Sequence, residues 1–258
     1  MGRGKINLVL LLLILGIGIL FWPAMCSLVH RHRDAAAIQM LQKQLEVTDI
    51  EKQRSLAEEY NLRLLTEEGA SQEGYDQILD FDGGMMGYLQ IPKLGAELPI
   101  YHGTGEAVLA KGVGHLAGSA FPIGGAGNHS VLAGHTGLPG AELFTNLTEL
   151  TEGDTFCIVI LGQILTYEVD QVKTVLPGEG DNLAPVPGED YCTLITCTPY
   201  GINSRRLLVR GKRVETETAP QQEPARQGRS PLSWLLPLAF GLPLLIAGVL
   251  LAVFKRRR

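Results

Sequence analysis

Cysteine and basic charge are both scarce in this chain of 258 residues. Its four cysteines form no paired C-x-x-C clamps and no dense framework, which argues against a zinc site and against a disulfide-stapled fold. Acidic residues outnumber basic ones by 27 to 22, and several basic residues lie at the two tips, which leaves the body acidic. We therefore expect no nucleic-acid partner. Four cysteines still leave room for a single reactive thiol.

Two long apolar runs at the ends exclude an ordinary soluble enzyme. The first, Ile6 to Trp22, has about the length that crosses a bilayer core, roughly 20 residues. Arg3 and Lys5 precede it and should stay in the cytoplasm. A cleaved signal peptide is the alternative, but its apolar core would be shorter, and Trp22-Pro23 offers no small-x-small cleavage site. We predict an N-terminal transmembrane anchor over residues 1–27.

The second run, Leu232 to Phe254, is followed by the basic tail Lys255 to Arg258, which places its C-terminal end in the cytoplasm as well. We predict a C-terminal transmembrane anchor with a basic tail over residues 231–258. The alternative for this run is a C-terminal sorting signal that a partner enzyme cleaves. Such a signal needs an L-P-x-T-G type motif just before the apolar run, and residues Pro220 to Ser233 contain none. With both ends inside, the prediction is a two-helix protein of the cell membrane whose body is extracellular.

Composition divides the body into three segments. Residues 28–84 begin with a Gln-, Glu- and Leu-rich stretch in which Ile38, Leu41 and Leu45 recur at helical spacing, so we predict amphipathic helices there. Residues 85–216 contain short β-rich runs between Gly and Pro turns, which predict a mostly β domain, a small barrel or sandwich. Residues 217–230, rich in Pro, Gln, Glu and Thr, predict a flexible linker.

Two groups of residues in the β-rich part have side chains suited to catalysis. The first is an apolar run that ends in His135, with glycines at 134 and 137 that leave the imidazole uncrowded. The second is the run Thr193 to Thr196, which delivers Cys197 at its end, just before a Pro/Gly loop. A thiol at such a strand end can meet a substrate. Arg205 and Arg206 begin the next run, and a fixed cation there would stabilise an oxyanion.

The remaining cysteines and histidines are assigned structural or solvated places. A cysteine is more often a small core residue than a nucleophile. We expect Cys192 to be packed within its strand, Cys157 to lie in the core, and Cys26 to lie at the membrane edge. The histidines are expected to be solvated near the membrane (His30 and His32) or structural or exposed in the β domain (His102, His115 and His129).

The motifs L-x-G-H-x-G around His135 and T-L-x-T-C at Cys197, with an arginine nine positions later, resemble those of the sortase family of Gram-positive surface transpeptidases. The resemblance covers about Met86 to Val214. Several further segments are similar to the class C, pilin-polymerising branch: Tyr101 to Thr104, Gly112 to Leu116, Gly137 to Pro139, Leu143 to Leu147 and Thr198 to Asn203.

The resemblance implies a closed β-barrel and a set of roles. Cys197 would be the nucleophile, His135 the general acid/base, and Arg206 the electrostatic partner. Arg205 is the rival of Arg206, because adjacent strand residues point to opposite faces. The implied substrates are pilins or surface proteins with an L-P-x-T-G-like signal, cleaved through a thioester and joined to a lysine amine of a pilin acceptor. This chemistry needs no metal and no organic cofactor.

One departure from class C and two alternative functions stay open. The Asp-Pro-aromatic lid motif is absent, since no proline occurs between Ala24 and Ile91. Residues 62–82 hold the lid's place in order, and Tyr75 or Phe81 would supply the ring, unless the stretch is a plain connector. The alternatives are a housekeeping sortase that attaches proteins to cell-wall peptide and a non-catalytic, membrane-tethered scaffold. The C-terminal apolar run favours the pilin branch over the housekeeping one.

Overall fold

The computed structural model describes most of the chain, namely residues 3–66, 74–81, 83–137, 143–179 and 183–215. Contacts divide it into a unit that holds the N-terminal residues up to Pro23 and a larger unit, Ala24–Thr218, that holds the β domain. The predicted linker at 217–230 and the predicted anchor at 231–258 lie outside the described residues.

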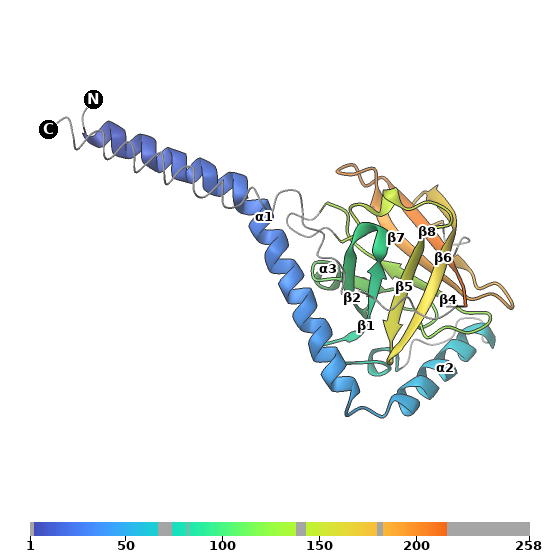
Figure 1. The fold of residues 1–258 in the computed structure, drawn as a ribbon. Coiled ribbons are helices and arrows are strands. Elements are labelled where there is room, and N and C mark those ends of the chain that lie inside the picture. Colours follow the sequence, from blue (N-terminus) through green and yellow to red (C-terminus); the bar gives the residue numbers. More distant parts are fainter. Residues whose placement is uncertain (1–2, 67–73, 82, 138–142, 180–182, 216–258) are drawn as a thin grey trace. The chain divides into compact units, whose positions relative to one another are not determined.

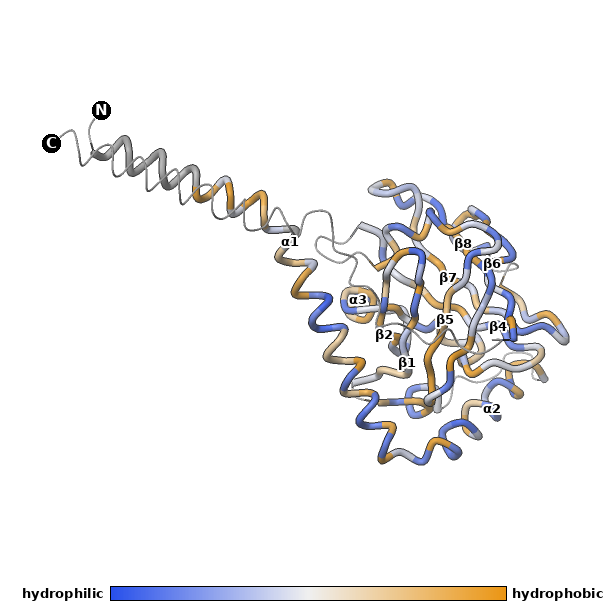
Figure 2. Tube along the Cα trace, viewed as in Figure 1, coloured by the Kyte–Doolittle hydropathy of each residue, from blue (hydrophilic) through white to orange (hydrophobic). Residues whose placement is uncertain are grey.

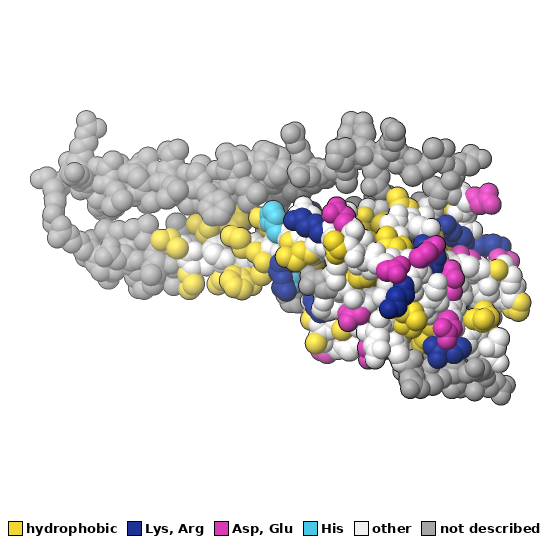
Figure 3. Space-filling view, turned by 90° about the horizontal axis from the view of Figure 1, so that it is seen from below, with side chains coloured by type: hydrophobic (Ala, Val, Ile, Leu, Met, Phe, Trp, Pro, Cys, Tyr) yellow, Lys and Arg dark blue, Asp and Glu magenta, His cyan; other side chains and the backbone are white. Residues whose placement is uncertain are grey.

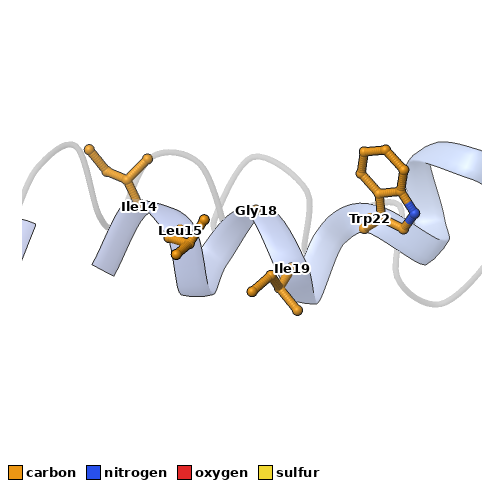
Figure 4. Close-up of a pocket in the computed structure, with 5 residues that line it drawn as sticks. All are labelled: Ile14, Leu15, Gly18, Ile19 and Trp22. Carbon is orange, nitrogen blue, oxygen red and sulfur yellow. The ribbon is translucent and has the colours of Figure 1, made fainter. Parts of the chain in front are cut away.

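The first apolar run forms the start of a long helix, α1 (Arg3–Leu45). Hydrophobic residues dominate its described part up to Trp22 and become mixed with polar ones further along (Figure 2). The side chains of Ile14, Leu15, Ile19 and Trp22 project from the helix around Gly18 (Figure 4) and are largely exposed. This part of α1 therefore presents an uncovered apolar surface.

The helices of the described ranges were compared with the length and apolar character that a membrane span requires. Within the described ranges, no helix alone has the length and apolar character to cross a bilayer, and one bent pair, Ile14–Trp22 with Met25–Leu45, meets those criteria jointly. On the face seen in Figure 3, hydrophobic side chains gather on α1, whereas acidic and basic side chains are interspersed over the β domain. The transmembrane helices stay a prediction.

Within the larger unit, the predicted amphipathic helices pack against the β domain. Ile38 and Leu41 of α1 are buried, as their spacing predicted. The next helix, α2 (Ile50–Thr66), begins where the Asp49 carboxylate accepts a hydrogen bond from the Lys52 N–H at 3.1 Å. The Asn61 side chain then exchanges two hydrogen bonds with the backbone of residue 121, of 2.7 and 3.1 Å. This pair of bonds fixes α2 to a loop of the β domain.

Eight strands of the described chain close into a barrel (Figure 1). Two neighbouring pairs, β2 with β3 and β4 with β7, are parallel, and the other six are antiparallel. A short helix, α3 (Glu106–Leu109), follows β2. In ring order the strands are β1 (Met85–Ile91), β2 (Ala96–His102), β3 (Val113–His115), β4 (His129–Ala133), β7 (Tyr191–Thr198), β8 (Arg205–Arg213), β6 (Gln163–Val175) and β5 (Thr155–Ile160).

The alternation of Phe156, Ile158 and Ile160 before Gly162-Gln163 predicts a hairpin, and β5 and β6 form it, with one correction to an expected position. The strands are joined by Leu161 and Gly162, both with positive φ, as a tight two-residue turn requires. Phe156 and Ile158 point inward and are fully buried. Cys157 stands between them, and successive residues of a strand face opposite sides. It is therefore half-buried on the outer face, and the prediction that Cys157 lies in the core is wrong.

The segment before β1 is part of the core, which corrects the expectation about a lid ring. The Tyr75 hydroxyl lies 2.9 Å from Nδ1 of His115 and accepts a hydrogen bond from the Gly103 N–H at 3.1 Å. Phe81 is also buried and pairs with Met85. Rings held in this way belong to the hydrophobic core, so the suggestion that Tyr75 or Phe81 serves as a lid ring is wrong.

Candidate active site

The parallel pairing of β4 with β7 brings the two sequence motifs to one edge of the barrel. Ala133 lies opposite Ile195, and the next N–H along the chain, that of Gly134, donates to the Ile195 carbonyl at 3.0 Å. His135 and Cys197 each lie two residues beyond this matched pair. Because the C-terminal ends of parallel strands meet at the same edge, the imidazole and the thiol are delivered together.

Two hydroxyl groups link the loop that contains His135 to strand β7, which contains Cys197. The buried Thr196 side chain, 4% exposed, donates to the Gly134 carbonyl at 2.7 Å. Its Oγ1 also lies 2.6 Å from Oγ1 of Thr136. Residues on both sides of His135 are therefore bonded to the residue directly before Cys197, which fixes the relative position of the two loops.

A close approach explains the glycine before His135. A Cβ at Gly134 would lie 2.6 Å from the ring of Phe144, a separation that real Cβ atoms essentially never show. Phe144 is fully buried, and its N–H donates to the His135 carbonyl at 3.1 Å. A side chain at position 134 would have to displace this ring, so the glycine lets the histidine loop settle onto the core.

Cys192 and Cys197 lie on the same strand but on opposite faces of it. They are five positions apart, and residues an odd number of positions apart on a strand point to opposite faces of the sheet. Cys192 is fully buried in the core, as predicted, and burial raises the pKa of its thiol well above the usual range, with the nearby Asp190 acting in the same direction. Cys197 is half-buried on the other face. Of the two, only Cys197 has both exposure and a place at the strand end.

The register of β7 with β8 separates the two candidate arginines. Arg206 lies directly opposite Cys197, whereas Arg205 lies opposite Thr198. Residues directly opposite each other in a sheet share a face, so Arg206 shares the face of the thiol. Its guanidinium donates to the carbonyls of Asn203 and Arg205, at 3.2 and 3.0 Å. These bonds hold the cation against the β7–β8 loop, on the side of β7 away from β4.

The other histidines of the barrel have structural hydrogen bonds, as expected. His102 contacts the carbonyls of Gly84 at 3.0 Å and Ile78 at 2.7 Å. His129 contacts the Thr193 hydroxyl at 2.7 Å and, through its other ring nitrogen, a backbone carbonyl. His115 is fully buried, and desolvation, with His102 acting in the same direction, lowers its pKa to about 4 although its bond to a carbonyl opposes this.

The sequence did not reveal the contribution of Thr136 and Thr196. Both belong to the motifs around His135 and Cys197, but they are 60 positions apart, and only the β4–β7 register brings their hydroxyls together. Within the described ranges, no group of three or more His, Cys, Asp or Glu side chains is placed to hold a metal ion.

Comparison with known proteins agrees with this geometry. A family model for the sortase domain matches residues 89–214. The structure of sortase C1 from Streptococcus agalactiae is 44% identical over 70% of this chain and 100% of that chain, with a TM-score of 0.67. A structure described as sortase C1 of GBS pilus island 1 is 38% identical over 74% of this chain and 96% of that one, with a TM-score of 0.68.

The similarity to curated sequences is more partial. Sortase D of Bacillus subtilis (strain 168) is 33% identical over 135 residues, which cover 51% of this chain and 65% of that protein. The chain thus spans slightly less than two thirds of this relative's length. With these matches, the chain belongs to the sortase family of cysteine transpeptidases, and its structural neighbours include class C sortases.

Proposed function

We propose that this protein is a membrane-anchored class C sortase that joins pilin subunits through isopeptide bonds. The observation that carries the proposal is the arrangement of three adjacent strands. β7 presents Cys197, its parallel neighbour β4 leads to His135, and its antiparallel neighbour β8 presents Arg206 directly opposite the thiol. A nucleophile, a proton carrier and a cation therefore flank one point at the barrel edge.

The proposed reaction proceeds through a thioester. The Cys197 thiolate attacks the threonine carbonyl of an L-P-x-T-G-like signal, and His135 protonates the departing glycine amine. A lysine amine of the next subunit, deprotonated by His135, then resolves the thioester into an isopeptide bond. Dividing the exchange in this way replaces one difficult step by two easier ones. Arg206 stabilises the negative oxygen of each tetrahedral intermediate, for which it must turn from the loop carbonyls toward the thiol.

Membrane anchoring is supported by the ends of the chain. The exposed apolar surface of α1 around Gly18 needs an apolar environment, and a bilayer supplies one. Basic residues precede the first apolar run and follow the second, so both ends are proposed to lie in the cytoplasm and the barrel outside. Two anchors would keep the catalytic domain beside pilins that still carry their own membrane segments.

A gene deletion in the source organism tests the proposal. We expect loss of the high-molecular-weight, SDS-resistant ladders of a pilin, while monomeric surface proteins stay attached to the wall. The wild-type gene and a Cys157→Ala variant should restore the ladders, whereas Cys197→Ala should not. Cys157 is the matched control because its thiol is also half-buried on the outer face of the barrel.

The two alternatives predict different results in the same strains. A housekeeping sortase would leave the ladders intact and release wall-anchored proteins into the medium. If the protein is a non-catalytic scaffold, the Cys197→Ala variant would restore the ladders as well as the wild-type gene does. Either result would contradict the pilin-polymerising proposal.

A further inference from the structure

The imidazole of His135 has two nitrogens in different surroundings. Its Nε2 is buried and has no hydrogen-bond partner among the described residues, although the side chain as a whole is 23% exposed. The acidic group beside it is Glu106, whose Oε1 lies 3.4 Å from Nε2. In the described part of the chain Nδ1 has no hydrogen bond either, but it is not buried in the same way. A buried polar nitrogen facing one carboxylate is unusual enough to require an explanation.

Glu106 is held in place by the short helix to which it belongs. The N–H groups of Val108 and Leu109 donate to the Gly105 carbonyl at 2.9 and 3.0 Å, which closes the turn around Glu106. Leu109 packs over Gly114 of β3, so close that a Cβ there would lie 3.0 Å from its Cδ2. The helix is thus seated on the barrel. Glu106 itself is 86% exposed, and its carboxylate makes no other ion pair or hydrogen bond within the described residues.

We propose that Glu106 is a positioning residue for His135. Its carboxylate accepts a hydrogen bond from the protonated Nε2, which selects one tautomer and one ring orientation. Nδ1 is then the atom that exchanges protons with the thiol and the amines. The inference rests on the proposed function and deepens it by assigning the two nitrogens. A separation of 3.4 Å is longer than a good N–H···O bond. Hydrogen bonds to a catalytic base are often long in the free enzyme and shorten when substrate binds.

The charge of Glu106 also bears on the transfer step. When the thiol proton moves to Nδ1, His135 becomes a positively charged imidazolium. The neighbouring carboxylate, which is negative, then stabilises that charge. The same arrangement of base and orienting carboxylate is familiar from hydrolases whose nucleophile is a hydroxyl. Because the Glu106 carboxylate is exposed to solvent, its effect should be modest, close to that of an exposed ion pair.

The first part of the test is kinetic and uses the full-length protein in detergent micelles. Thiol-dependent cleavage of a fluorogenic L-P-x-T-G peptide is followed for wild type, Glu106→Gln, Glu106→Ala and the control Glu152→Ala. Glu152 is an exposed glutamate that makes no ion pair or hydrogen bond with the described residues. We expect kcat to fall by about two- to fivefold in Glu106→Ala with KM unchanged. Glu106→Gln should recover part of the loss, because its amide oxygen can still accept a hydrogen bond from Nε2. The control should match wild type.

The second part reads the tautomer directly and does not depend on activity. The chain contains six histidines, so selective ¹⁵N labelling of histidine gives a tractable spectrum, in which His135→Gln identifies the His135 signals. We expect the proton on Nε2 in wild type and a mixture of tautomers in Glu106→Ala.

The outcomes separate the two claims. An unchanged tautomer in Glu106→Ala overturns the role of Glu106, as does a rise in KM with kcat intact, which would indicate a contact with peptide instead. Absence of thiol-dependent cleavage by wild type would contradict the proposed function, while the spectra would still test Glu106.

Discussion

Individual side chains at the barrel edge are distinguished by the face on which they stand. Arg205 and Arg206 are neighbours in sequence, yet only Arg206 lies opposite Cys197 in the β7–β8 ladder. The two cysteines of β7 differ in the same way, since Cys192 faces the core and Cys197 faces outward. Chemistry at this site therefore depends on strand parity, and a shift of register by one residue would replace the thiol and the cation together.

Arginine substitutions test this parity. Arg206→Ala should lower kcat/KM for a sorting peptide by about 10²- to 10³-fold, the usual loss when a group that stabilises the oxyanion is removed. Arg205→Ala should stay within about threefold of wild type, because its side chain stands on the opposite face. Steady-state cleavage assays of both variants provide the measurement. Similar losses in the two variants would contradict the assignment of Arg206.

The buried His115 should make stability depend on pH. Its pKa is lowered to about 4 by burial, so the folded protein excludes a proton that the unfolded chain binds below about pH 6.5. Stability should therefore fall as the pH falls from about 6.5 to about 4, by about 3 kcal/mol from this group. Thermal unfolding of wild type and His115→Gln at pH 7 and pH 4 measures it. The variant should lose less stability over this interval, and an equal loss would refute the role of His115.

At the level of elements, the site depends on how the loop after β4 is fastened to β7. Thr196 donates to the Gly134 carbonyl and meets the Thr136 hydroxyl, and these bonds lie on both sides of His135. No contact between β4 and β7 is local in sequence, since the strands are about 60 residues apart. The proposed catalytic pair, His135 and Cys197, is thus brought together only when the barrel closes.

Replacing Thr196 isolates this fastening. Thr196→Val keeps the shape but leaves the buried Gly134 carbonyl without this donor and the Thr136 hydroxyl with only the Phe144 carbonyl, at 3.5 Å. This should cost about 1–3 kcal/mol of stability and reduce turnover. Thr196→Ser keeps the hydroxyl and should retain most of the activity. Thermal melts and peptide cleavage on the same preparations compare the two. Equal activity of the two variants would show that the hydroxyl has no part in holding the site.

Local patterns predicted the elements better than the contacts between them. The hairpin at Gly162 and the strand that ends at Cys197 follow from turn chemistry and β-branched composition, and both are present. The placement of Cys157 failed because period-two alternation assigns it to the outer face, opposite the apolar residues around it. The prediction of Tyr75 as a lid ring failed because the sequence around it, a polar connector, gave no sign of its contact with His115, 40 residues away. The parallel β4–β7 register left no local trace in the sequence either.

On the scale of the whole molecule, the anchors and the barrel have separable roles in the proposed function. In this proposal the chemistry belongs to the barrel, and the apolar ends would confine it to the membrane plane in which unprocessed pilins accumulate. Confinement raises the effective concentration of one subunit near another without any new contact.

Deleting residues 232–258 tests this separation. The truncated protein should lose more pilin polymer than peptide hydrolysis, because only the first depends on confinement near the membrane. Ladder formation in cells and cleavage of a soluble L-P-x-T-G peptide by the purified protein are the two readouts. Equal losses in both would mean that the C-terminal run is needed for folding, and the confinement argument would fail.

The thioester at Cys197 is the central claim, and intact-mass spectrometry of the full-length protein tests it most directly. Incubated with a sorting peptide in the absence of an amine acceptor, wild type and Cys157→Ala should gain the mass of the peptide cleaved between threonine and glycine. The adduct should map to Cys197 after digestion and disappear with hydroxylamine. Cys197→Ala should gain nothing. An adduct of the same mass on Cys197→Ala, or one that maps to another residue of wild type, would contradict the account.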